Sequence, residues 1–255
     1  AAEMGHTLVL QYLLEAGGKE FIQGVNNDGA SVAYLAAMNG HSATLEWVGS
    51  EEVGGMELLM VKTSEGMSCV HQAAYNGHME ALKYLGKACG TEHLEDTADD
   101  GVTSAWLAAQ NGHVEVLEFL GRECAAGIFS IPNNEGTTPS YMAAQNGQVQ
   151  ALKYLGKVVG KEGLMVVDED DCSLAHAAAS NNNVEVLEYL VEQCSSSILT
   201  IPDNVGRTPC IYAANDGHLD ALKHIVNVVG REEFLRTSNN GTTVLLASLD
   251  CGQSR

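Results

Sequence analysis

The sequence predicts an all-α solenoid of stacked helix-turn-helix units joined by long loops, because one pattern recurs along the whole chain. Its first mark is a glycine two residues before a Ser or Thr: Gly29, Gly66, Gly101, Gly136, Gly206 and Gly241, with Asp171 in the same position. Successive marks are 37 residues apart once and 35 residues apart five times. Eleven residues after each of the seven marks stands a second glycine, which one unit replaces with Asn182. Such a period indicates an array in which each unit buries its apolar face against its neighbours.

Residues 99–124 show how each unit is expected to fold. Residues 99–101 read Asp-Asp-Gly, which is typical of a tight turn. Thr103 is a favourable N-cap for a short helix over 104–111. Gly112 ends that helix in the left-handed conformation. A longer helix over 114–124 follows, with apolar residues at helical spacing.

The best-preserved units carry a motif of the form Gly-x-Thr-Pro, then Ala-Ala, then Gly-His. It stands at residues 136–139 with Ala143-Ala144, and at 206–209 with Ala213-Ala214 and Gly217-His218. This motif resembles the ankyrin repeat, and the resemblance covers almost the whole chain. The usual ankyrin period is about 33 residues, so the extra residues here predict a longer loop after the second helix.

We expect a single ankyrin repeat array over residues 1–255. The predicted boundaries are a half repeat at 1–26, repeats at about 27–63, 64–98, 99–133, 134–168, 169–203 and 204–238, and a partial repeat at 239–255. The chain begins without Met and stops part-way through a repeat. We therefore expect a piece of a longer protein.

The charge of the chain narrows the class of partner. The formal net charge is −20, with 13 Lys and Arg against 33 Asp and Glu. Nucleic-acid binding depends on basic residues that neutralise phosphates, so this composition argues against it. The same charge opposes anionic membranes, and no apolar run is long enough for membrane insertion. A basic protein partner is compatible with this charge; the alternative is that the charge only keeps the protein soluble.

The cysteines predict buried free thiols. The seven cysteines include no Cys-x-x-Cys pair, and Cys89, Cys124 and Cys194 occupy one shared position in their units. Neighbouring helices stack about 8–10 Å apart, which is too far for a disulfide between such positions. We therefore expect a protein of a reducing, intracellular compartment, most simply the cytoplasm.

The histidines predict structure, not catalysis. Five of them share one position, directly after a glycine at the start of the longer helix: His6, His41, His78, His113 and His218. His71 and His176 lie three repeats apart, and Cys172 with His176 offers only two possible ligands. A zinc site needs three or four. We find no catalytic pair, metal site or cofactor loop, and expect a protein that is not an enzyme and holds no cofactor.

Four glycines interrupt the longer helices at one shared position: Gly49, Gly86, Gly121 and Gly156. Glycine inside a helix costs about 0.5–1 kcal/mol relative to Ala. Two explanations remain open. Either the helix ends early at this point, or a packed loop or a partner approaches the helix closely.

The resemblance also implies where a partner binds. In ankyrin-like stacks the turn tips and the exposed side of the short helices line a concave groove. By position, the groove would contain acidic residues at the tips, an apolar anchor, two glutamines and one cation: Asp28, Glu65, Asp99, Asp100, Glu135, Glu169 and Asp170; Met38, Met67, Tyr75 and Val102; Gln110 and Gln145; and Arg207.

We therefore predict a non-catalytic protein–protein interaction scaffold whose concave face binds a basic, Lys/Arg-rich protein segment. A simpler explanation of the acidic tips is that Asp and Asn are good turn formers. The alternative function is a regulatory or docking segment, or an accessory subunit, of a larger enzyme, channel or multi-subunit complex.

Overall fold

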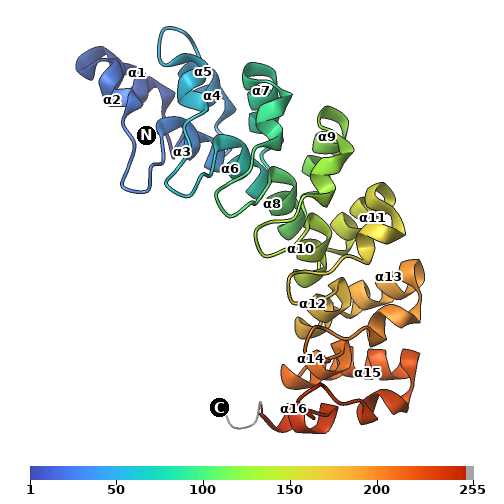
Figure 1. Ribbon diagram of the computed structural model, residues 1–255. Helices are drawn as coiled ribbons and strands as arrows, with labels where there is room; N and C mark the ends of the chain where they lie inside the picture. Colours follow the sequence, from blue (N-terminus) through green and yellow to red (C-terminus); the bar gives the residue numbers. More distant parts are fainter. Residues whose placement is uncertain (251–255) are drawn as a thin grey trace. The chain divides into compact units, whose positions relative to one another are not determined.

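A computed structural model describes residues 1–250, and this part of the chain folds as a series of α-helices and short 3-10 turns without named strands (Figure 1). It divides into two compact units, residues 1–134 (unit 1) and residues 135–255 (unit 2). Each unit is described by itself. The predicted all-α, ankyrin-like architecture is confirmed.

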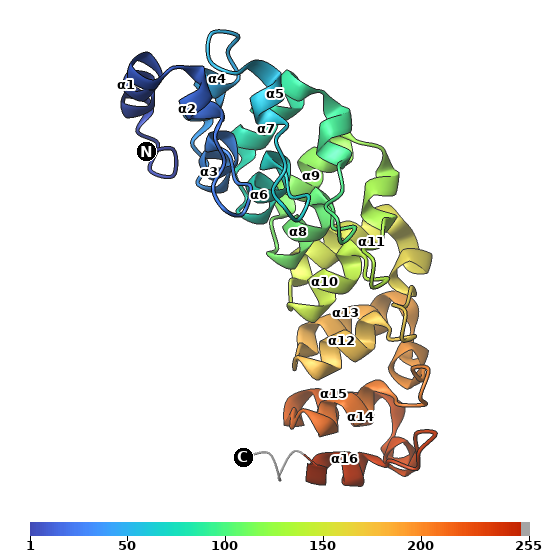
Figure 2. The same cartoon turned by 60° about the vertical axis from the view of Figure 1, so that its left-hand side comes forward.

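Unit 1 pairs short helices with longer ones. Its elements are α1 (Thr7–Gly17), α2 (Lys19–Gln23), α3 (Val32–Met38), α4 (Ser42–Val48), α5 (Gly55–Leu59), α6 (Cys69–Tyr75), α7 (Met79–Cys89), the 3-10 turn η1 (Thr91–Glu95), α8 (Ser104–Gln110), α9 (Val114–Glu123) and η2 (Ala126–Ser130). The short helices α3, α6 and α8 pack side by side in one row, and α4 packs against α7 (Figures 1 and 2).

Unit 2 repeats this arrangement. Its elements are α10 (Pro139–Gln145), α11 (Val149–Leu164), α12 (Leu174–Ser180), α13 (Val184–Cys194), η3 (Ser196–Thr200), α14 (Pro209–Asn215), α15 (Leu219–Val229), η4 (Arg231–Leu235) and α16 (Val244–Asp250). The short helices α10, α12, α14 and α16 form one row, and α11, α13 and α15 form the second (Figure 2).

The local signals of the sequence act as expected at the helix ends. The Ser31 hydroxyl accepts a hydrogen bond from the Tyr34 amide at 3.1 Å, and the Thr103 hydroxyl accepts one from the Trp106 amide at 3.1 Å. These bonds satisfy amides that have no partner inside the helix. Gly112 has φ +73° and closes the short helix α8, which begins and ends within one residue of its prediction.

Within each unit, the alanine pairs of the short helices lie where neighbouring repeats pack together. Ala73 and Ala74 of α6 and Ala178 and Ala179 of α12 are fully buried. Because these side chains are so small, the backbones of neighbouring short helices approach closely. The leucines of the longer helices, such as Leu117, are equally buried and complete the core.

The histidines at the start of the longer helices tie each repeat to the one before it. His78 Nε2 lies 3.1 Å from the Met38 carbonyl oxygen, and His113 Nε2 lies 2.9 Å from the Tyr75 carbonyl oxygen. In each case the ring nitrogen donates to a carbonyl at the end of the preceding short helix. The predicted structural role of these histidines is confirmed.

At three of the four shared positions the glycine does not mark an early helix end, and close packing explains Gly49, Gly86 and Gly156. Gly86, Gly121 and Gly156 lie within α7, α9 and α11, and only Gly49 follows the end of its helix. A Cβ atom at Gly86 would lie 3.1 Å from Leu94 Cδ1. A Cβ atom at Gly156 would clash with the Tyr189 hydroxyl of the next longer helix.

The connecting loops contain more structure than the sequence predicted. In four repeats the loop after the longer helix forms a 3-10 turn whose apolar side chains are buried, such as Leu94 in η1 and Phe129 in η2. Where the period is 37 residues, the five-residue helix α5 takes this place. The longer period therefore adds a short packed element to each repeat.

The cysteines of the described residues are free thiols, as predicted. Cys69, Cys172, Cys194 and Cys210 are buried, and Cys89 and Cys124 are half-buried. Burial raises the pKa of the Cys69 thiol to about 12, so it stays protonated at neutral pH. Cys251 lies outside the described residues.

Candidate protein-binding surface

Most of the turn tips that precede the short helices are shaped by a side-chain acceptor three residues before the first glycine, or before Asp171. Asn26 Oδ1 accepts hydrogen bonds from the Asp28 amide at 3.0 Å and the Ala30 amide at 2.8 Å. Asp168 Oδ1 does the same for the Asp170 amide at 2.9 Å and the Cys172 amide at 2.8 Å. These acceptors hold the backbone of the tip, and the residues between them point their side chains outward.

Backbone hydrogen bonds join each tip to the next. In unit 1 the amides of Ser64, Asp99 and Asn134 donate to the carbonyls of Asp28, Glu65 and Asp100 at 3.0, 3.1 and 2.8 Å. In unit 2 the amides of Glu169, Asn204 and Asn239 donate to the carbonyls of Glu135, Asp170 and Val205 at 3.3, 3.0 and 2.8 Å. Within each unit the tips therefore form a row with regular spacing.

The predicted acidic residues of the tips are all exposed. They are Asp28, Glu65, Asp99 and Asp100 in unit 1, and Glu135, Glu169 and Asp170 in unit 2. Some of them also take part in local bonds: Asp100 Oδ1 accepts from the Val102 amide at 3.1 Å. Each unit thus carries its own row of carboxylates in contact with solvent.

The predicted apolar anchor is only partly at the surface. The Tyr75 side chain is 42% exposed, whereas Met38 and Met67 are half-buried. The inclusion of Val102 in the anchor was wrong: it is 5% exposed and forms a buried cluster with Ala98 and Leu107. The short helix α8 covers Val102, so this side chain supports the half-buried Met67 and Trp106 and is not available to a partner.

Gln110 and Gln145 end their short helices as half-buried side chains. They occupy the same repeat position as Met38 and Tyr75. In unit 1 this position is therefore apolar or aromatic on α3 and α6 and polar on α8, and in unit 2 it is polar on α10.

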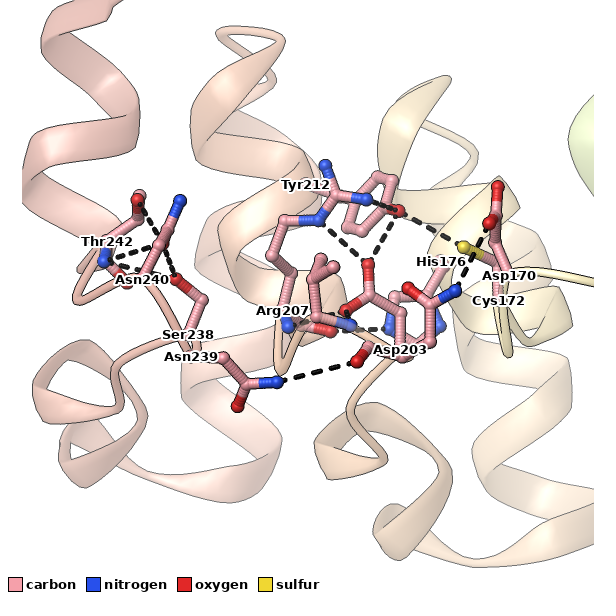
Figure 3. A network of polar contacts seen from close by, with 12 residues as sticks. Asp170, Cys172, His176, Asp203, Arg207, Tyr212, Ser238, Asn239, Asn240 and Thr242 are labelled. Carbon is pink, nitrogen blue, oxygen red and sulfur yellow. Dashed lines mark hydrogen bonds and ion pairs between the residues drawn. The ribbon is translucent and has the colours of Figure 1, made fainter.

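Arg207 is engaged in a polar network of unit 2 (Figure 3). Its Nε donates to Asp203 Oδ2 at 2.8 Å, and its guanidinium also donates to the Tyr212 hydroxyl at 2.8 Å. The Tyr212 hydroxyl donates to Asp203 Oδ2 at 3.0 Å, and Cys172 Sγ lies 3.1 Å from the same hydroxyl. The guanidinium also lies over the Tyr212 ring, 4.7 Å from its centre.

The Asp203 carboxylate neutralises Arg207 locally. Burial alone would raise the pKa of the Asp203 carboxyl, but hydrogen bonds from the Arg207 backbone and side chain outweigh it and lower this pKa. The sequence prediction missed Asp203 because it considered only the two residues directly before each glycine. The recurrence of Asn, Thr, Asp or Ser one residue earlier, at 26, 63, 168, 203 and 238, was the available signal.

The described residues contain no cluster of three or more His, Cys, Asp or Glu side chains suited to a metal ion. His71 and His176 are each buried and fully engaged by neighbouring groups. The Nδ1 atoms accept from the Ser68 amide at 3.1 Å and the Ser173 amide at 3.0 Å, and the Nε2 atoms bond to the Val102 and Arg207 carbonyls of the next repeat. Over residues 1–250, no helix is both long and apolar enough to cross a membrane.

A family model described as ankyrin repeats in three copies matches the chain five times, over residues 54–128, 70–162, 122–201, 158–232 and 175–254. These matches overlap and together extend over most of the chain. The protein belongs to the ankyrin repeat family. A search of curated proteins gave no match.

Ankyrin repeats are generally protein–protein interaction modules, and ankyrin repeat proteins are typically non-catalytic scaffolds. The repeats of unit 1 offer carboxylates and a partly exposed tyrosine. The repeats of unit 2 offer carboxylates and an Arg207 side chain that is hydrogen-bonded to Asp203 and Tyr212.

Proposed function

We propose that this ankyrin repeat protein is a non-catalytic interaction scaffold that binds a Lys/Arg-rich segment of a partner protein along its acidic turn tips. The observation that carries the proposal is the row of exposed carboxylates, one or two at each of the first five tips, in unit 1 and the first part of unit 2. The net charge of −20 supports it, because the field of the whole chain attracts cationic segments.

The regular backbone bonds between tips give further support. Because each tip is hydrogen-bonded to the next, the carboxylates are held at fixed intervals before a partner arrives. Binding then orders little of the scaffold, which lowers the entropic cost of association. A flexible acidic tail would lack this advantage.

The test measures the affinity of a fluorescent oligolysine peptide for the 255-residue chain. Fluorescence anisotropy reports the binding at low and at high salt. Asp99→Asn combined with Asp100→Asn removes two tip charges and keeps the side-chain oxygen that accepts from the Val102 amide. The matched control is Glu115→Gln combined with Glu118→Gln, which removes two exposed charges from α9.

We expect added salt to weaken binding, because exposed charges are screened over about 10 Å at 0.1 M salt. We expect the tip variant to lose more affinity than the control, by at least about threefold. Binding that is insensitive to salt, or equal losses in both variants, would contradict the proposal.

A further inference from the structure

Two neighbouring short helices of unit 1 carry a partly exposed apolar surface, which we name the tyrosine face. It consists of Tyr34, Leu35 and Met38 of α3 and Gln72 and Tyr75 of α6. Tyr75 is 42% exposed and the other four side chains are half-buried. Helices α3 and α6 pack directly against each other, so they contribute to one continuous surface.

Two acidic tips lead directly into the helices of this face: Asp28 stands four residues before Val32, where α3 begins, and Glu65 stands four residues before Cys69, where α6 begins. The pKa of Tyr34 is raised, chiefly by burial and further by the carboxylates of Glu65 and Asp28. The apolar face and the acidic tips of unit 1 therefore form one surface with an aromatic floor and a negative edge.

The negative edge has a defined period. Asp28, Glu65 and Asp100 each stand directly before the first glycine of their repeat, and all three are exposed. Their tips are joined by one backbone hydrogen bond per step. Since helices packed side by side are about 8–10 Å apart, we take this as the spacing of the three carboxylates.

This period distinguishes between the conformations that a bound segment could adopt. A polyproline II helix has three residues per turn and rises about 9 Å per turn, so every third side chain returns to the same side at the spacing of the tips. In a β-strand every third side chain points to the opposite face. An α-helix rises about 5.4 Å per turn, which matches the tips only at every second turn.

We propose that unit 1 binds a proline-rich segment in the polyproline II conformation that carries Lys or Arg at every third position. The basic side chains meet Asp28, Glu65 and Asp100, and the proline rings pack on the tyrosine face. Aromatic surfaces are the usual receptors of such segments, because the segment is already extended before it binds. This inference rests on the proposed function and specifies the partner of the same surface.

Two peptides of identical composition test the proposal with the whole 255-residue chain. The first repeats Lys-Pro-Pro, and the second has the same lysines and prolines with the lysines at irregular intervals. Both are measured by fluorescence anisotropy against the unmodified chain, Tyr75→Ala and a control. The control is Tyr12→Ala, which removes a tyrosine from α1 that is 68% exposed and lies outside the tyrosine face.

We expect the regular peptide to bind at least about fivefold more tightly than the irregular one. Tyr75→Ala should abolish this preference, and Tyr12→Ala should leave it unchanged. Equal affinity for the two peptides would overturn the polyproline II inference while leaving the acidic-tip function standing. Salt-insensitive binding, or no binding, of both peptides would overturn the two proposals together.

Discussion

At the scale of single residues, His71 is a base that the fold keeps neutral. It is fully buried, its Nδ1 accepts from the Ser68 amide, and its Nε2 donates to the Val102 carbonyl at 3.1 Å. Burial lowers the pKa of His71 from 6.5 to about 4. The neutral ring therefore caps α6 and joins it to the next repeat.

The first prediction concerns pH. Between pH 6.5 and about 4 the unfolded chain binds a proton at His71 and the folded chain does not, so the free energy of unfolding falls as the pH falls. The loss attributable to His71 is about 3 kcal/mol. Urea unfolding at several pH values should show a shallower pH dependence in His71→Gln than in the unmodified chain. An unchanged slope would show that His71 is not the group responsible.

Asn183 shows how a repeat can replace the histidine at the start of the longer helix, whose position is occupied by Gln148 in one other repeat. It stands at the position of His78 and His113, and its Nδ2 donates to the carbonyls of Ala144 at 3.0 Å and Gln145 at 2.8 Å. The amide thus makes the same kind of link between repeats as the imidazole ring.

The second prediction follows from this link. Asn183→Ala should lower the free energy of unfolding by about 1–3 kcal/mol, because the carbonyls of the buried Ala144 and the half-buried Gln145 lose this donor. Asn183→His should recover most of the loss by restoring the donor of most other repeats. Urea unfolding compares both with Glu192→Ala, an exposed change on the same helix that should be near neutral. Equal effects of Asn183→Ala and Glu192→Ala would show that the link contributes little.

At the scale of elements, the longer helices pack so closely that one methyl group matters. Gly156 lies inside α11, and a Cβ atom there would clash with the Tyr189 hydroxyl and lie 3.2 Å from Leu164 Cδ1. Gly49 has the same relation to Tyr84 in unit 1. A tyrosine of one longer helix therefore fits over a glycine of the preceding one.

The third prediction tests this fit. Ala has the higher helix propensity by about 0.5–1 kcal/mol, yet Gly156→Ala should destabilise the protein by about 1–3 kcal/mol through overpacking. Adding Tyr189→Phe should recover part of the loss, since it removes the hydroxyl that clashes. Gly127→Ala is the control, because a Cβ atom at Gly127 meets nothing within 4 Å. Thermal unfolding of the four proteins decides: a stabilised Gly156→Ala variant would refute the close fit.

The elements also show how far the sequence determines the fold and the site. The helix pairs were predictable because caps, glycines and apolar spacing are local signals, and their recurrence made each one more certain. The 3-10 turns were not, since a buried pair such as Ile128 and Phe129 has no helical period. The burial of Val102 depends on contacts made in three dimensions, which its position in the repeat does not reveal. The bond between Asp203 and Arg207 was signalled in the sequence only by the recurring polar residue three positions before the first glycine.

At the scale of the whole molecule, the repeats share a scaffold and differ in what they expose. The shared positions, including the alanine pairs and the histidine links, are buried or bonded between repeats and are not available to a partner. What differs is the outer surface: the tyrosine face in unit 1 and the Arg207 network in unit 2. Recognition of a partner therefore has to come from positions that the repeat pattern leaves variable.

The net negative charge is the other property of the whole chain, and it destabilises the folded state. With a formal charge of −20 spread over 255 residues, the carboxylates repel one another most when the chain is compact. The fourth prediction is that raising NaCl from about 20 mM to about 0.5 M increases the unfolding temperature, because the Debye length shrinks several-fold over this range. The tip variant Asp99→Asn with Asp100→Asn should unfold at a higher temperature than the unmodified chain at low salt, and this advantage should shrink at high salt. A midpoint that does not respond to salt would mean that the repulsion is already relieved in the folded state, and the acidic tips would then have no electrostatic reason to attract a basic partner.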